Sequence, residues 1–139
     1  MIPCRLQSSV TAMTSTIALH RLAEAFLSLA RQEARVGYAS GDRQKIRNAA
    51  ERAWMAGVQA TDAAMARYGL VPEPGSRVDA SRREFLAKAG SEDLSRRWNS
   101  LGETLHEGCY NWGRIPEEQE MAQTLEEVAE FIRQVTEET

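Results

Sequence analysis

Apolar residues recur at every third or fourth position along most of the chain, which is the spacing of one buried face of an α-helix. The first such segment begins after residues 14–16, whose hydroxyl groups can cap a helix, and ends near Gly41. Asp42 is a good N-cap for a second helix that extends to Tyr68. The apolar stripe of this helix consists mainly of Ala and Gly, so we expect the first two helices to pack closely as an antiparallel hairpin. The stripe contains Ile46, Ala49, Ala50, Ala53, Trp54, Gly57, Val58, Thr61, Ala64, Met65 and Tyr68.

The second half of the chain is separated from this hairpin by a loop, because Pro72, Pro74 and Gly75 cannot continue a helix. A short helix is predicted over residues 81–89, followed by a fourth helix and by a last helix that begins at Pro116. The apolar seam of the fourth helix is Leu94, Trp98, Leu101, Leu105 and Trp112, and that of the last helix is Met121, Leu125, Val128, Ile132 and Val135. The sequence therefore predicts an all-α fold, an up-and-down helical bundle of four principal helices plus one short helix, with no sheet.

At 139 residues the chain has the size of one domain. We expect a single helical bundle domain over residues 17–139. Residues 1–16 are rich in Ser and Thr and are predicted to be a disordered N-terminal extension, in which Met13 is an alternative start. The extension lacks the continuous apolar segment of a signal peptide, and no stretch of the sequence is apolar enough to span a membrane. The expected location is cytoplasmic, with no membrane partner.

The net charge of −3 is unevenly distributed. Residues 1–113 carry 15 basic and 12 acidic groups, whereas residues 114–139 carry 2 basic and 8 acidic groups. The acidic C-terminal segment is interpreted either as a solvated helix face or as a docking arm.

Only Cys4 and Cys109 are present, without a CxxC pair, so neither a disulfide framework nor a cysteine zinc site is expected.

Histidine chemistry is limited to His20 and His106. Glu103 and His106 have the Glu-x-x-His spacing of dimetal helical bundles, but such sites need a second pair and two further carboxylates. We therefore expect no metal, and the lack of phosphate-loop, dinucleotide-binding and hydrolase motifs predicts no cofactor. Cys109 lies one helical turn from His106, and its position favours a small buried residue over a nucleophile.

Basic side chains gather in two places where they could contact phosphate groups. The candidate ligand-binding residues are Arg43, Lys45 and Arg47 in the first cluster and Arg96 and Arg97 in the second. The alternative is ordinary solvated helix surface, because no aromatic residues alternate with these charges as a stacking platform requires. Trp54, Trp98 and Trp112 all fall on apolar stripes, so we expect them in the core, with Trp54 against the first helix.

Two segments resemble a known family of helical proteins. Gly41-Asp42, followed by Ala-Ala-Glu-Arg-Ala-Trp-Met-Ala-Gly-Val at residues 49–58, resembles the second-helix signature of HEPN-type helical bundle proteins, especially the PaREP1-related branch. Leu105-His106 with Tyr110 is similar to the Leu-His-x-x-x-Tyr segment of that branch, and the matching helices cover residues 17–112. The resemblance implies an up-and-down bundle, commonly a homodimer, among RNA-cleaving toxins, partners of small nucleotidyltransferases, and nucleotide or RNA binders.

The ribonuclease members of that family carry an Arg, then four to six residues, then a His on one helix, and this motif is incomplete here. At about 100° per residue, Arg97 and His106 lie on opposite sides of their helix, and Arg96 is about 80° out of line with His106. Asn99 lies within roughly 20° of His106, which gives a polar pair without a cation. His106, Asn99 and Arg97 are the candidate catalytic residues, but the chemistry also needs a positioned positive charge.

The leading hypothesis is a non-catalytic HEPN-like module that forms a homodimer and binds a protein partner, such as a nucleotidyltransferase, or a nucleotide or RNA ligand. The alternative is a divergent ribonuclease that uses His106 with an arginine supplied across the dimer interface. A basic cleft lined by Arg96, Arg97 and His106 would favour the enzyme. An apolar dimer interface with the two copies of His106 far apart would favour the binding module.

Overall fold

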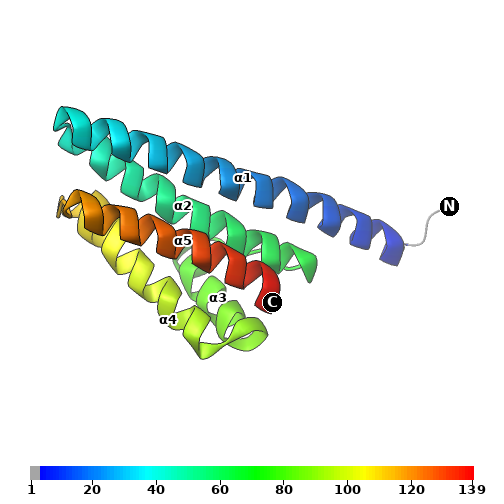
Figure 1. The fold of residues 1–139 in the computed structure, drawn as a ribbon. Helices are drawn as coiled ribbons and strands as arrows, with labels where there is room; N and C mark the ends of the chain where they lie inside the picture. The colour runs from blue at the N-terminus through cyan, green and yellow to red at the C-terminus, as the bar shows by residue number, and fades with distance from the viewer. Residues whose placement is uncertain (1–3) are drawn as a thin grey trace.

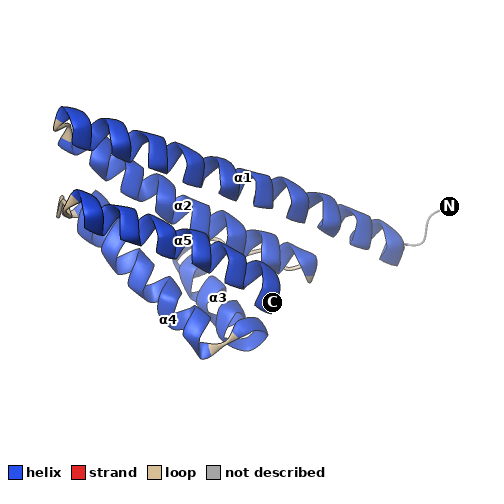
Figure 2. Cartoon of the chain, in the orientation of Figure 1, coloured by secondary structure: helices blue, strands red, loops and turns tan. Residues whose placement is uncertain are grey.

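The computed structural model describes residues 4–139, and this part of the chain contains helices and no strand (Figures 1 and 2). The α-helices are α1 (Cys4–Ser40), α2 (Arg43–Arg67), α3 (Val78–Phe85), α4 (Glu92–Leu101) and α5 (Glu118–Glu138). The other helical segments are η1 (Gly75–Arg77), of 3₁₀ type, and η2 (Leu86–Gly90) and η3 (Gly102–Asn111), both of π type. The predicted all-α class is confirmed, and α3 with η2 corresponds to the short helix expected over residues 81–89. Within the same residues 4–139, none of the helices combines the length and the apolar character that crossing a membrane requires.

α1 begins well before the position that the sequence pattern indicates. Residues 4–16 belong to this helix, and residues 1–3 lie outside the described part of the chain. The reason is local, because no Gly or Pro occurs between Cys4 and Val36 and each residue added to an existing helix gains a hydrogen bond. α1 therefore projects beyond the end of α2 (Figure 1). The disordered extension expected over residues 1–16 stays a prediction.

Small side chains bring α1 and α2 together as the antiparallel hairpin that the sequence predicts (Figure 1). Completely buried alanines line both helices: Ala23 and Ala30 on α1, and Ala49, Ala50 and Ala53 on α2. Near the turn, a Cβ atom at Gly37 would lie only 2.9 Å from Cγ1 of Ile46. The close approach of the two helices therefore depends on small residues, alanine and glycine, at their contact.

The turn between α1 and α2 uses the residues that the sequence suggests. Gly41 has φ +68°, a left-handed conformation that ends α1 at little steric cost. The Asp42 carboxylate then accepts a hydrogen bond from the backbone N–H of Lys45 and caps α2.

The rest of the core lies on the side of α2 that faces α4, η3 and α5. The predicted apolar stripe of α5 is confirmed, since Met121, Leu125, Val128, Ile132 and Val135 are all buried. Phe131 completes this layer, and its ring lies 3.7 Å from the position that a Cβ atom would take on Gly57 of α2. The first four residues of the seam predicted for the fourth helix are also buried: Leu94, Trp98, Leu101 and Leu105.

An ion pair attaches α3 to α2. Nε and one terminal nitrogen of Arg82 donate to the two carboxylate oxygens of Asp62 at 2.8 and 3.0 Å, and both side chains are mostly buried. Burial opposes the charge of Arg82, but the hydrogen bond and the charge of Asp62 outweigh it and raise the pKa of the guanidinium above its ordinary value. The pair fixes α3, and with it the neighbouring Arg83, against the bundle.

The η3 segment changes the helical phase of the end of the fourth predicted helix. Its i→i+5 bonding uses more residues per turn than an α-helix, so side chains after Gly102 fall progressively out of line with the seam of α4. Trp112 is 66% exposed, and its predicted place in the core is therefore wrong. Gly108 permits the wide turn, because a Cβ atom there would lie 2.9 Å from the carbonyl oxygen of Glu103.

Trp54 is buried as predicted, but its neighbours are on a different helix from the one expected. Its ring centroid lies 4.4 Å from that of Trp98 on α4. Its outer edge lies 3.1 Å from the position that a Cβ atom would take on Gly102. The indole thus packs on the side of α2 that faces α4 and η3, and the expectation that it lies against α1 is corrected.

Alanine substitutions should distinguish the buried from the exposed tryptophan. Trp54→Ala removes a buried ring and should lower the free energy of unfolding by about 3–5 kcal/mol. Trp112→Ala should change it by less than about 0.5 kcal/mol, because most of that ring is in solvent. Urea unfolding followed by far-ultraviolet circular dichroism measures both values, and equal losses for the two variants would contradict the exposed position of Trp112.

Candidate functional site

His106 on η3 is paired with Glu51 on α2. Nδ1 of His106 lies 2.7 Å from Oε2 of Glu51, which assigns the Nδ1–H to the imidazole and the acceptor role to the carboxylate. The imidazole also stacks near Trp54 and Tyr110, whose ring centroids are each 6.3 Å away. These contacts fix the orientation of the ring and leave Nε2 as the nitrogen that can exchange a proton with a ligand.

His106 lines a cleft of about 300 Å³ between α3, α4 and η3. Asn99 lines the same cleft, so the structure brings the predicted polar pair together. The remaining lining residues are Trp54, Asp79, Arg83, Trp98, Gly102, Glu103 and Glu107. The sequence did not associate Arg83 or Glu51 with His106, because their approach to His106 depends on how α3 and α2 pack against η3 and leaves no signal in the spacing of residues.

Carboxylates outnumber cations in this cleft. Asp79, Glu103 and Glu107 line it together with one arginine, Arg83. The Arg83 guanidinium makes no ion pair with any residue that the structure describes. The local charge is therefore unfavourable for a phosphate group and favourable for a ligand that donates hydrogen bonds or carries positive charge.

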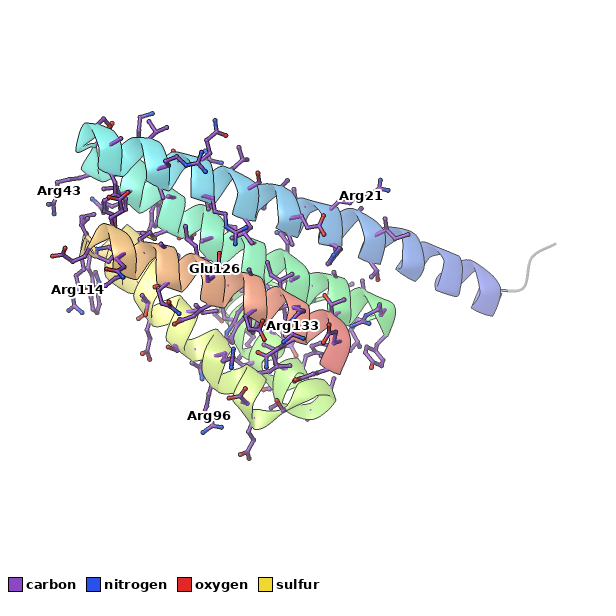
Figure 3. The ribbon with its side chains drawn as sticks, viewed as in Figure 1. Arg21, Arg43, Arg96, Arg114, Glu126 and Arg133 are labelled. Carbon is purple, nitrogen blue, oxygen red and sulfur yellow. The ribbon has the colours of Figure 1, made fainter. Side chains whose placement is uncertain are left out.

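Arg96 and Arg97 do not reach the His106 cleft. Nε of Arg97 lies 3.2 Å from Oδ2 of Asp93, and a terminal nitrogen of Arg96 lies 3.8 Å from Oδ1 of the same residue. Arg97 lines a different hollow, together with Glu127 of α5. Arg96 projects away from the helices in Figure 3. Within one chain, these residues therefore do not form the basic cleft that would favour the enzyme hypothesis.

Cys109 and the acidic residues show no sign of a reactive or metal-binding site. Burial raises the pKa of the Cys109 thiol, and the nearby positive charge of Arg47 only partly opposes this effect. A protonated, buried thiol is a packing residue and a poor nucleophile. Among the side chains that the structure describes, no three His, Cys, Asp or Glu residues lie close enough together to hold a metal ion.

A second group of candidate residues lies where the start of α2 meets the end of η3. Nε of Arg47 donates to the carbonyl oxygen of Tyr110 at 3.0 Å, and a terminal nitrogen donates to that of Asn111 at 3.3 Å. A terminal nitrogen of Arg43 donates to the carbonyl oxygen of Gly113 at 3.4 Å. Arg47 therefore caps the C-terminal carbonyl groups of η3, which gives it a structural role within the chain.

Trp112 and Arg114 complete this surface. The Arg114 guanidinium lies 4.9 Å from the centroid of the Trp112 ring, within the range of a cation–π contact. Figure 3 shows Arg43 and Arg114 at the same end of the molecule. We call Arg43, Trp112 and Arg114 the bundle-end patch. An exposed aromatic ring thus accompanies the first basic cluster, which the sequence pattern did not predict.

Two neighbouring features limit the extent of this patch. Lys45 lies on another side of α2, with its Cβ 3.2 Å from the position that a Cβ atom would take on Gly37 of α1. Tyr38 donates a hydrogen bond to the carbonyl oxygen of Pro116 at 2.7 Å. Burial, and then the negative charges of nearby groups that include Glu118, raise the pKa of Tyr38 to about 12. The acidic first turn of α5 therefore lies toward Tyr38.

Comparisons of the chain with protein-family models, with curated proteins and with solved structures gave no match. The resemblance to HEPN-type bundles therefore remains a prediction that rests on the two sequence segments.

The two histidines should adopt opposite tautomers when neutral. His106 bonds to Glu51 through Nδ1, whereas His20 pairs with Glu24 through Nε2 at 3.1 Å. Long-range ¹H–¹⁵N correlation spectra should show Nδ1–H for His106 and Nε2–H for His20. Glu51→Gln should weaken the preference at His106 and leave His20 unchanged. An Nε2–H signal for His106 in the unsubstituted protein would contradict the geometry of the pair.

Proposed function

We propose that the chain is a non-catalytic HEPN-like module, an up-and-down bundle of four principal helices and one short helix, that forms a homodimer and binds a nucleotide or single-stranded RNA. The bundle-end patch is the observation that carries the ligand assignment. Trp112 is 66% exposed, and Arg114 lies over its ring. A large exposed indole beside cations is the combination with which proteins bind unpaired nucleotides.

Each part of the patch has a distinct role in this proposal. The indole of Trp112 supplies a stacking surface for a base, which contributes about 1–3 kcal/mol per stacked base in other proteins. Arg114 and Arg43 supply positive charge for the adjoining phosphates. The hydrogen bond from Arg43 to Gly113 is long at 3.4 Å, so a phosphate group can replace it at little cost.

A protein partner, such as a nucleotidyltransferase, is the other ligand class that the family resemblance implies. The bundle-end patch favours the nucleotide, because cations and one aromatic ring match a phosphate and a base. The acidic lining of the His106 cleft favours a different ligand, one that donates hydrogen bonds or carries positive charge. RNA binding that requires Trp112 would support the first ligand class, and failure of RNA to bind at low salt would favour the second.

Substitutions in the bundle-end patch should weaken RNA binding. Trp112→Ala should raise the Kd for a fluorescein-labelled single-stranded RNA about 5- to 150-fold, which corresponds to one lost stacking contact. Arg114→Ala should reduce the salt dependence of binding, because one phosphate contact is lost. Arg96→Ala is the matched control, since Arg96 is an exposed arginine far from the patch, and it should leave binding unchanged. Fluorescence anisotropy at several salt concentrations measures these effects, and equal affinities for Trp112→Ala and the unsubstituted protein would contradict the proposal.

One observation favours the alternative, a ribonuclease. The contact between Glu51 and His106 orients an imidazole toward a cleft, as a general base requires. Phosphoryl chemistry also needs a positive charge beside the reacting phosphate. Arg83 lines the cleft, but the negative charges of several carboxylates in the same cleft offset its positive charge. An arginine from a second copy would have to supply the missing charge.

The dimeric protein should therefore not cleave a structured RNA in the presence of EDTA. The test compares the unsubstituted protein with His106→Ala and Arg83→Ala, and His20→Ala serves as the control for removal of a histidine outside the cleft. Cleavage that is lost in His106→Ala and Arg83→Ala but kept in His20→Ala would replace the binding module with a ribonuclease. Cleavage that is equal in all four proteins would indicate a contaminating nuclease.

A further inference from the structure

The outer face of α1 carries a regular stripe of uncharged residues. Seven positions between residues 18 and 39 follow the alternating spacing of four and three that defines a coiled-coil seam. They are Ala18, Leu22, Ala25, Leu29, Gln32, Val36 and Ala39, and we call them the α1 seam. Six of the seven are apolar and none is charged, although 27% of the residues of the chain are charged.

Every position of the α1 seam faces solvent in the single chain. Its large residues are strongly exposed, with Leu22 at 42%, Leu29 at 46% and Val36 at 45%. The residues that α1 packs against its own bundle, such as Ala23 and Ala30, lie on the opposite side of the helix. In Figure 1, α2 covers one side of α1 and the other side is open, and Figure 3 shows Arg21, which precedes Leu22 in the sequence, on the open side.

Scattered exposed leucines are ordinary in soluble proteins, but an aligned row of them is not. Large residues occupy one seam position of each heptad, and small or polar residues occupy the other. Such an alternation lets the large side chains of one helix fit between the small side chains of another. The pattern therefore fits a second helix of the same kind better than a flat or irregular surface.

We infer that the α1 seam is the surface through which two copies of this chain associate, by pairing their α1 helices around a two-fold axis. This inference rests on the self-association in the proposed function and names the surface that performs it. A two-fold interface brings the same patch of both copies together, so a seam that is complementary to itself is sufficient. The absence of charge along the seam removes the repulsion that like charges would create between identical faces.

The length of α1 is consistent with an interface of the required size. A helix of 37 residues is about 55 Å long, and a contact strip about 10 Å wide along it would bury roughly 1,100 Å² over both copies. The segment from residue 18 to residue 39 alone would bury only about 700 Å², less than the roughly 1,000 Å² in total that a specific interface should exceed. An interface of that size therefore needs most of the length of α1, and the uncharged spacing continues in the sequence at Cys4, Ser8, Thr11 and Ser15.

Charged substitutions in the seam test this assignment. Leu22→Glu combined with Leu29→Glu should raise the Kd for dimerisation at least tenfold in sedimentation velocity experiments. The variant should keep the far-ultraviolet circular dichroism of a folded helical protein, because both side chains are exposed in the single chain. The matched control combines Leu70→Glu with Val71→Glu, which adds the same charge at two exposed apolar positions outside α1 and should leave the dimer intact.

A mixing experiment shows whether both copies use the same face. The pair Leu22→Lys and Leu29→Lys should also prevent dimerisation alone, whereas an equimolar mixture of the Glu and Lys variants should restore it through opposite charges along one seam. A Glu variant that dimerises as strongly as the unsubstituted protein would overturn the inference, as would an unsubstituted protein that stays monomeric at 100 μM. The RNA titration of Trp112→Ala tests the ligand assignment independently, so the two proposals can fail separately.

Discussion

The wide helical turn of η3 determines how the functional side chains of this protein are arranged. Its i→i+5 bonds shift the phase of the chain after Gly102, and Gly108 makes room for the carbonyl group that a side chain would meet. Two consequences follow from the shift. His106 lies within hydrogen-bonding distance of Glu51, and Trp112 leaves the core and becomes exposed beside Arg114. Both candidate sites therefore depend on one departure from α-helical geometry, which is typical of π segments at functional positions.

The packing of α1 against α2 imposes a second constraint. Alanine and glycine let these helices approach closely, but such small residues bury a narrow strip of α1. The opposite side of α1 keeps its leucines and valine exposed, because the bundle has no further helix to cover them. The same feature thus explains the stability of the hairpin and the apolar face on which self-association is proposed.

Arginine residues in this molecule serve mainly to hold elements together. Arg47 caps the carbonyl groups at the end of η3, Arg82 ties α3 to α2, and Arg52 pairs with Glu33 of α1 at 2.6 Å. A place in a basic cluster of the sequence therefore does not show that an arginine is available to a ligand. Arg43 of the first cluster contacts the carbonyl oxygen of Gly113, next to the exposed indole, at the end of the molecule where Arg114 also lies.

The sequence by itself determined the helical class, the cap at Asp42, and most of the buried stripes of α2 and α5, because these features depend on spacing and hydrogen bonding within a few residues. It also placed His106 and Asn99 on the same side of one helix, and both line the same cleft, although the count of 100° per residue runs through a segment that is not α-helical. Only the tertiary structure decided the position of Trp112, the partner of Trp54, and the presence of Arg83 and Glu51 beside His106. These features depend on contacts between helices distant in the chain or on a change of helical pitch. Local periodicity encodes neither the contacts nor the change of pitch.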